Sequence, residues 1–372
     1  METIAMINIA LSVLFTLCYL YQAIYLVAPF IMKRREKREE MAARPVVMHR
    51  YAVLISARNE ERVIGHLIRS IREQNYPSEL VTVFVVADNC TDRTAEVAEA
   101  EGAVVYRRFN KQRVGKGYAL DFLLSQILRD YPRDAFDGFF VFDADNILDS
   151  NYIAEMNRTF SQGYRIITSY RNSKNYGDNW VSAGYSLWFL RESRYLNHAR
   201  MLLGTSCAIS GTGFLVHRDI IEKYGGWKFF LLTEDIEFSV SNIIDGERIA
   251  FCKDAILYDE QPTSFRQSWL QRLRWAKGFY QVFAKYGGAL VRAMIRRRSF
   301  ACFDMLMIIV PSILLSFLGV FCSIVAAILG AALGVDVSPA ARALLATAVN
   351  GYLLLFFVGG VTLMTEWRSE EH

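Results

Sequence analysis

The segment GFFVFDADN, residues 138–146, decides how the polar centre of this chain folds and where its chemistry lies. Its first five residues are glycine, phenylalanine and valine, a composition typical of a strand buried inside a sheet. Asp143 and Asp145 follow directly, and in an extended chain side chains two residues apart share one face. Two close carboxylates repel each other unless a cation or a proton lies between them. The segment therefore predicts a strand that ends in a site for a hard divalent cation and a diphosphate.

The sequence on either side of this strand alternates between strand and helix patterns. Short β-branched or aromatic runs predict strands, and amphipathic runs between them predict helices. The predicted strands are residues 51–56, 81–87, 103–106 and 138–142, and the predicted helices are residues 60–74, 91–100 and 118–130. This alternation predicts an α/β domain with a mostly parallel sheet, within residues 48–262. Ligands of such sheets bind beyond the carboxyl ends of the strands.

Polar residues follow the first and second predicted strands as well as the fourth. Residues 56–60, with the sequence SARNE, follow the first strand, and residues 88–92, with the sequence DNCTD, follow the second. We expect these groups to meet Asp143 at one rim of the sheet. An alternative role for Asn59 and Asp92 is to cap the helices that begin there. Lys116, between two glycines, can bring a positive charge and bare backbone amides to the same phosphates.

A second acidic motif, TEDIE at residues 233–237, lies further along the chain. A carboxylate there can act as a base toward an incoming hydroxyl. After Pro262 the sequence predicts a helix, because Ser264 and Gln267 have capping-box spacing. Apolar residues then recur at helical intervals, namely Phe265, Trp269, Leu273, Ala276, Tyr280 and Phe283. Residues 263–298 therefore predict amphipathic helices that can lie in a membrane interface.

Three residues of the predicted helix after Pro262 lie on a different face from its apolar stripe. Gln271, Arg274 and Trp275 are spaced i, i+3 and i+4, so they can reach one site together. The alternative is that the polar face of this helix is simply solvated.

Three stretches of the chain carry no charged residue: between Glu2 and Lys33, between Asp304 and Asp336, and between Arg342 and Glu366. Each meets the roughly 20 residues that an α-helix needs to cross a bilayer. We expect a transmembrane helix within residues 1–32 and a transmembrane hairpin within residues 304–365, joined by a loop at 335–340. Basic residues at 33–38 and 296–298 then predict a multi-pass protein of the cell membrane whose catalytic domain is cytoplasmic. The same basic clusters predict contacts with anionic membrane lipid.

The composition also excludes several classes of protein. The net charge of +4 is modest, and no basic stripe with interleaved aromatics indicates nucleic acid. The six cysteines and five histidines are scattered, which argues against a disulfide framework or a zinc site. Gly211-Thr212-Gly213 lacks the third glycine of a dinucleotide fingerprint, and there is no Walker A sequence. Both observations argue against a dehydrogenase or a nucleoside triphosphatase.

Taken in order, the motifs resemble those of the membrane-embedded family 2 glycosyltransferases of the processive type. These include the cellulose, hyaluronan and poly-N-acetylglucosamine synthases. The residues that carry the resemblance are Asp88, Asp143-Ala144-Asp145, Thr233-Glu234-Asp235 and Gln271-x-x-Arg274-Trp275, and it extends over residues 51–278. The resemblance implies a GT-A fold, a UDP-sugar donor, and Mg²⁺ or Mn²⁺ as cofactor.

The resemblance also implies a role for each motif. The nucleotide-sugar donor would be held by Ala57, Asn59, Glu60, Asp88, Lys116, Asp143, Gln271, Arg274 and Trp275. Asp145 would ligate the metal, with Asp143 beside it. Asp235 matches the general base, with Glu234 next to it. The acceptor would lie against Gly211, Thr212, Gly213 and Trp275.

The sequence leaves the acceptor open. The resemblance favours inverting transfer to a growing polysaccharide, and the alternative is single-sugar transfer to a glycolipid or polyprenyl-phosphate acceptor in the membrane. A third class is a receptor that binds nucleotide-sugar without reaction. Only two charge-free stretches follow the catalytic region, and a bilayer core cannot solvate a polar polymer. Polymer export would therefore require additional helices, from a homo-oligomer, a further C-terminal segment or a partner membrane subunit.

Overall fold

The computed structural model describes residues 2–34, 37, 43–309, 311–332, 334 and 338–366. Parts of the basic segment 33–38 and of the expected loop at 335–340 lie outside these residues. Its centre is an eight-stranded sheet with the order β3-β2-β1-β4-β7-β6-β8-β5. The strands are β1 Tyr51–Ala57, β2 Val81–Asp88, β3 Val104–Arg108, β4 Gly138–Asp143, β5 Ile147–Leu148, β6 Ile166–Ser173, β7 Phe214–His217 and β8 Ile249–Asp259. The four predicted strands are confirmed as β1 to β4.

The sheet is mixed but mostly parallel, as predicted: six of the eight described strands run in one direction, and β7 and β5 run in the other. β1 runs parallel to β2 and β4, β2 runs parallel to β3, and β6 runs parallel to β8. β7 lies antiparallel between β4 and β6, and β5 is antiparallel to β8. The direction of β7 follows from where the chain enters the sheet. Its preceding loop lies against the carboxyl end of β4, where Gly213 N donates to Val141 O, so β7 must run back along β4.

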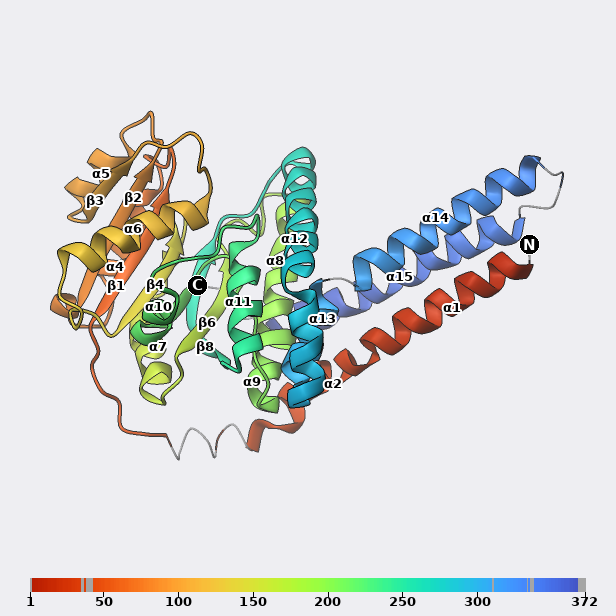
Figure 1. Ribbon diagram of the computed structural model, residues 1–372, viewed down its shortest axis with the longest axis horizontal. Coiled ribbons are helices and arrows are strands. Elements are labelled where there is room, and N and C mark those ends of the chain that lie inside the picture. The colour runs from red at the N-terminus through yellow and green to blue at the C-terminus, as the bar shows by residue number, and fades with distance from the viewer. Residues whose placement is uncertain are drawn as a thin grey trace.

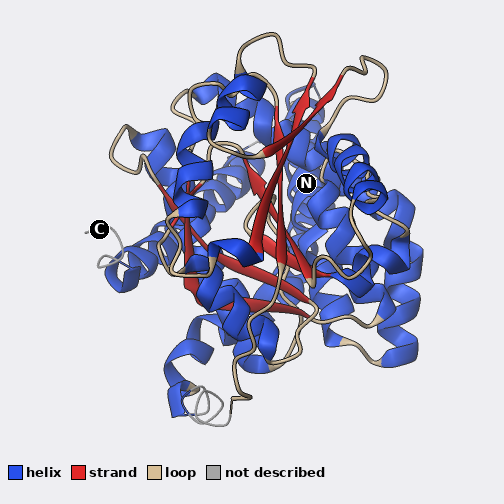
Figure 2. Cartoon of the chain, turned by 90° about the vertical axis from the view of Figure 1, so that its left-hand side faces the viewer, coloured by secondary structure: helices blue, strands red, loops and turns tan. Residues whose placement is uncertain are grey.

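Helices cover both faces of the sheet (Figure 2). They are α4 Ile64–Arg72, α5 Thr94–Ala100, α6 Lys116–Asp130, α7 Tyr152–Ser161, α8 Trp180–Arg191, α9 Ala199–Leu203, α10 Arg218–Tyr224, α11 Glu234–Asp245, α12 Phe265–Arg297 and α13 Phe300–Ile309. Neighbouring residues of one strand enter opposite cores: Leu54 packs in the core that contains Phe238 of α11, and Ile55 packs in the core that contains Tyr152 of α7. Burial on both faces explains why β1, β2 and β4 are almost continuously apolar.

The predicted helices are confirmed, with ends shifted by a few residues. Helices expected at 60–74, 91–100 and 118–130 are α4, α5 and α6. The start of α12 is also as predicted, since Ser264 is its N-cap and Ser264 Oγ accepts a hydrogen bond from Gln267 N at 3.2 Å. Capping of this kind satisfies an N–H group that has no partner within the helix.

Three long helices, α1 Glu2–Tyr19, α14 Pro311–Ala332 and α15 Ser338–Glu366, lie side by side and extend away from the sheet (Figure 1). Across the described residues, no helix combines the length and the apolarity that crossing a membrane requires. The expected transmembrane helices are therefore not found, and the prediction of a multi-pass cell-membrane protein with a cytoplasmic catalytic domain is wrong.

One of the three expected spans is not a single helix. The first charge-free stretch is divided by a 3₁₀ turn at Leu20–Gln22. The helix that follows the turn, α2 Ala23–Ile31, packs Tyr25 and Ala28 against Ala199 of the domain. The second stretch begins inside α13, where Asp304 forms a buried ion pair with Arg200.

Candidate active site

Side chains from the end of β4 and from the first turns of two helices meet at one rim of the sheet. Lys116, the first residue of α6, forms an ion pair with Asp143, the last residue of β4. Lys116 Nζ also donates to Gly211 O at 2.7 Å. Gly211 in turn lies next to the second acidic motif, since a Cβ at that position would be 4.0 Å from Asp235 Oδ2. The structure thus brings together residues that are up to 119 positions apart, from Lys116 to Asp235.

The loop at 211–213, expected to contact the acceptor, is fixed against the Asp143 turn. Asp143 N donates to Thr212 Oγ1 at 2.9 Å and to Asn146 Oδ1 at 3.1 Å, and Thr212 Oγ1 donates to Asn146 Oδ1. Gly213 has φ +68°, and a Cβ there would lie 1.9 Å from Leu257 Cδ2. Only glycine permits both the left-handed backbone and this close approach to β8. Loop 211–213 and the turn at Asp143 therefore form one unit.

A buried polar network behind this unit was not identified from the sequence. Asn146 Nδ2 donates to Asp259 Oδ1 at 2.8 Å, and Asp259 also forms an ion pair with Arg171. Arg171 Nη1 donates to Ser210 O at 2.8 Å, so the network also reaches the residue that precedes loop 211–213. Asp259 is a carboxylate at the end of a strand, as Asp88 and Asp143 are. That signal identifies Asp259 once β8 is recognised as a strand.

Asp145 has the features of a metal ligand. Its Oδ1 is buried and has no hydrogen-bond partner among the described residues. Burial, followed by the nearby charges of Asp259 and Asp143, raises the pKa of Asp145. An unpartnered buried carboxylate oxygen is unusual and fits a site that a cation completes. The described residues contain no group of three metal-ligating side chains, so a divalent ion would take further oxygens from diphosphate and water, as Mg²⁺ often does.

Glu234 and Asp235 are the first two residues of α11, at the same rim. Burial raises the pKa of both carboxyl groups. The neighbouring Asp235 charge raises the pKa of Glu234 further, whereas Lys116 acts in the opposite direction on both. The same two carboxylates, with Asp143, keep Lys116 protonated: burial lowers its pKa, but their charges raise it overall. A carboxylate with a raised pKa is a stronger base than a solvated one, as proton abstraction from a hydroxyl requires.

The residues expected at the nucleoside join two neighbouring loops. Ala57 ends β1 and is buried, and Asn59 adopts φ +59° and accepts from Thr91 N at 2.8 Å. Glu60 N donates to Thr94 Oγ1 at 2.8 Å, and burial followed by the charge of Asp143 raises the Glu60 pKa. Asn59 therefore links the loop after β1 to the loop after β2 instead of only capping a helix.

Asp88, the last residue of β2, is almost fully buried, with 5% of its surface exposed. It forms an ion pair with Arg108 at 2.5 Å and accepts from Asn89 Nδ2 at 2.9 Å. Arg108 Nη2 also donates to Arg113 O at 2.6 Å. Arg108 thus holds the orientation of Asp88. It was not identified from the sequence, because it lies on a different strand.

The three residues of the Gln271-x-x-Arg274-Trp275 motif lie beside the loop that leads into α11. Arg274 Nη1 donates to Leu232 O at 3.5 Å, and the Trp275 ring meets Tyr185 edge-on at 6.0 Å. Gln271 Oε1 is buried without a hydrogen-bond partner among the described residues. Among the described residues, no hydrogen bond or ring contact joins the motif to Asp143 or Asp235, so the motif lies beside the start of α11 and not against the carboxylates.

Comparison with protein families identifies a match over most of the sheet domain. The model described as "Glycosyltransferase like family 2" matches residues 49–278. Among curated proteins, the "Probable glycosyltransferase YdaM" of Bacillus subtilis (strain 168) is 27% identical over 270 residues, 67% of this chain and 59% of the relative. The "Beta-monoglucosyldiacylglycerol synthase" of Trichormus variabilis is 28% identical over 290 residues, 75% of this chain and 58% of the relative. The chain thus spans about three fifths of the length of these relatives.

The fold is shared with a solved structure, the "Mannosyltransferase PcManGT from Pyrobaculum calidifontis in complex with GDP-Man and Mn2+". The TM-score is 0.60 at 18% identity, and the match covers 99% of this chain and 100% of that one. At this identity the likeness concerns the fold, which is a GT-A-like α/β fold with a mixed sheet. The expected fold class is confirmed in that form.

Proposed function

The chain belongs to the family 2 glycosyltransferases, and from that premise we propose that it transfers a single sugar from a UDP-sugar to a lipid acceptor. The use of a UDP-sugar donor is supported by one observation at the rim of the sheet. There Lys116 contacts both Asp143 and Gly211, and Gly211 lies next to Asp235. A cation, two acidic turns and a carboxylate with a raised pKa are what diphosphate binding and hydroxyl activation need.

The reaction follows from the roles of these groups. Asp235 takes the proton of the acceptor hydroxyl while the hydroxyl oxygen forms a bond to the anomeric carbon. The bond between that carbon and the diphosphate oxygen breaks, and UDP leaves with the electron pair. Lys116 offsets negative charge that grows on the diphosphate. A divalent ion held by Asp145 and Asp143 would supply further charge neutralisation when bound. The Mn²⁺ and GDP-Man named for PcManGT agree with such a donor site.

The proposal of a lipid acceptor is based on the surface next to Gln271, Arg274 and Trp275. Phe265, Trp269, Leu270 and Leu273 of α12 and Trp180 of α8 are all at least 50% exposed. The centre of the Phe265 ring lies 6.4 Å from that of the Trp180 ring and 6.3 Å from that of the Trp269 ring. Exposed apolar side chains that gather in this way indicate a site for an apolar partner.

The relatives support the same choice. The name of the Trichormus variabilis relative specifies a monoglucosylated diacylglycerol as its product. The "4,4'-diaponeurosporenoate glycosyltransferase" of Staphylococcus aureus (strain USA300) is 42% identical over 71 residues, 18% of each chain. Both names describe glycosylation of apolar molecules. We therefore favour the lipid acceptor, the alternative of the sequence analysis, over a growing polysaccharide.

The test is transfer from radiolabelled UDP-sugars by purified full-length protein, with diacylglycerol in detergent micelles as acceptor. We expect one sugar per acceptor in the organic extract, measured by mass spectrometry. The Asp235→Asn variant should lack this product, and the matched Asp254→Asn variant, which changes an exposed aspartate of β8, should retain it. A ladder of lengthening water-soluble products would contradict the lipid acceptor. The absence of turnover with every UDP-sugar would contradict the proposed transferase activity.

A further inference from the structure

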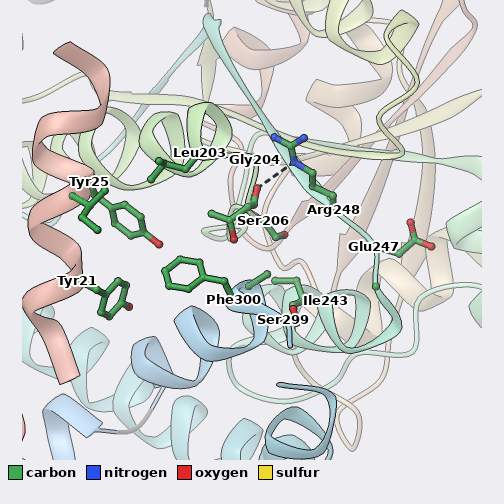
Figure 3. A pocket seen from close by; sticks show the side chains of 14 residues that line it. Tyr21, Tyr25, Leu203, Gly204, Ser206, Ile243, Glu247, Arg248, Ser299 and Phe300 are labelled. Carbon is green, nitrogen blue, oxygen red and sulfur yellow. Dashed lines mark hydrogen bonds between the residues drawn. The ribbon is translucent and has the colours of Figure 1, made fainter. Parts of the chain in front are cut away.

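A cavity of about 500 Å³ lies at the opposite end of α11 from Asp235. Ile243, near the carboxyl end of α11, and Gly246, just after it, form part of its wall. With 12 residues, α11 is about 18 Å long, so this cavity is separate from the sugar-transfer rim. The other walls come from α2 and the preceding turn, residues 203–206, residues 247–248 and the start of α13 (Figure 3). Its volume lies within the usual range for ligand sites.

Unpartnered polar atoms gather on one side of the cavity. Tyr25 is 1% exposed, and its hydroxyl, which points into the cavity, has no hydrogen-bond partner among the described residues (Figure 3). The same is true of Thr205 Oγ1, which also lines the cavity. Behind Tyr25, the buried Arg200 guanidinium lies 5.4 Å from the tyrosine ring and has an unpartnered Nη2. Buried polar groups are nearly always paired, so the two unpaired hydroxyls in the cavity wall, with the unpaired Arg200 Nη2 behind them, indicate a ligand that accepts hydrogen bonds.

The charges around the cavity favour an anion. Arg248 is fixed in the wall, where its Nη2 donates to Met201 O at 2.9 Å and its Nε donates to Thr205 O at 3.2 Å. No carboxylate pairs with Arg248 in the part of the chain that the structure describes. The acidic groups nearby are already paired: Glu247 forms an ion pair with Arg165, and Asp304 with Arg200.

The start of α13 adds positive charge to the same cavity. Phe300 and Ala301, in its first turn, line the cavity, and Ser299 precedes them. The first turn of a helix carries partial positive charge and N–H groups without intrahelical partners. This effect acts together with Arg248 and the unpartnered atoms of Tyr25 and Thr205.

The mouth of the cavity is apolar. Ile24 is 57% exposed, Phe300 is 45% exposed and Leu203 is 36% exposed. A ligand that matches both parts has an anionic head and a hydrocarbon tail. We propose that this cavity binds the phosphate group of a lipid, with the head against Tyr25, Thr205 and Arg248 and the acyl chain against Ile24, Leu203 and Phe300. This site goes beyond the proposed transferase activity, because it serves neither the donor nor the reacting hydroxyl.

The experiment measures binding to the full-length protein by thermal shift and calorimetry, independently of sugar transfer. The probes are dihexanoyl-phosphatidic acid below its micelle concentration, dihexanoylglycerol as its uncharged counterpart, and inorganic phosphate. We expect the lipid phosphate to raise the melting temperature, inorganic phosphate to raise it less, and dihexanoylglycerol to leave it unchanged. Tyr25→Phe and Thr205→Val remove single oxygens that have no protein partner, so both variants should fold normally and bind about tenfold more weakly.

Tyr152→Phe is the matched control, since the Tyr152 hydroxyl of α7 is also buried without a described partner but lies in the core beside Phe142. This variant should bind like the wild type. Equal affinity for inorganic phosphate and for the lipid phosphate would overturn the lipid assignment in favour of a free-phosphate site. No binding of either probe, or binding that Tyr25→Phe and Thr205→Val do not weaken, would overturn the site itself.

Discussion

Removal of the Glu237 carboxylate is expected to loosen the helix that carries the second acidic motif. The Glu237 side chain is fully buried. Its Oε2 accepts from Phe230 N at 2.8 Å and Leu231 N at 2.9 Å, and its Oε1 accepts from Lys285 Nζ at 2.6 Å and Tyr286 Oη at 3.1 Å. Glu237 thus joins three parts: α11, the loop before it, and α12.

The contacts give the size of the effect. Each backbone N–H bond to a charged acceptor contributes about 1.5 kcal/mol. The Lys285 side chain is 51% exposed, so solvent screens its ion pair, which contributes about 0.5 kcal/mol. Glu237→Ala should therefore lower the free energy of unfolding by about 3–4 kcal/mol. Glu237→Gln keeps one oxygen for the two N–H groups and should cost about 1 kcal/mol.

Urea unfolding followed by circular dichroism measures these differences, and Glu99→Ala is the control. Glu99 forms an ion pair with Arg107 at the surface, where its side chain is 45% exposed, so this change should cost less than about 0.5 kcal/mol. Sugar transfer should fall in Glu237→Ala, because the released loop leads into Glu234 and Asp235. Equal losses of stability in Glu237→Ala and Glu237→Gln would show that the hydrogen bonds to the loop do not account for the loss, and would contradict this prediction.

Three further predictions concern the rim. Asp235→Asn should slow sugar transfer by about 10²–10⁴-fold while calorimetry finds UDP affinity unchanged, because asparagine keeps the size of the side chain but takes no proton; wild-type turnover in this variant would contradict the base. Asp145→Ala should weaken UDP binding only when Mg²⁺ or Mn²⁺ is present, and EDTA should stop the wild-type enzyme; turnover that persists in EDTA would rule out the ligand role. Burial raises the pKa of Glu234 and Asp235, so the base becomes protonated at a higher pH than a solvated carboxylate does. The transfer rate should therefore fall with decreasing pH already above the ordinary carboxyl pKa of about 4. A rate that stays constant down to about pH 4 would contradict the raised pKa.

The sequence by itself determined the first half of the sheet and the place of its chemistry. β1, β2 and β4 are buried on both faces, so each is an almost continuous apolar run that is recognisable without knowledge of its neighbours. Because parallel strands end at one edge, Asp88 and Asp143 could be assigned to the same rim from strand ends alone. The start of α12 was equally local, since the Ser264 cap involves only residues within one turn.

Only the tertiary structure decided how distant segments combine. β7 has four residues, too few for a periodic pattern, and its antiparallel direction depends on the loop that delivers it to the sheet. Asn146 and Asp259 pair across 113 positions of sequence, and no local pattern encodes such a partner.

The TEDIE motif shows the same division within five residues. Asp235 and Glu237 are both acidic and lie on one helix, yet Asp235 belongs to the rim and Glu237 is enclosed by Lys285, Tyr286 and two backbone amides. Likewise, the charge-free stretch after Glu2 is uniform in sequence, but it is divided into α1, a turn and α2 because Tyr25 and Ala28 pack on Ala199. Residue type and spacing determine which groups are apolar, charged or helical, whereas the partner that each group contacts depends on segments that only folding brings together.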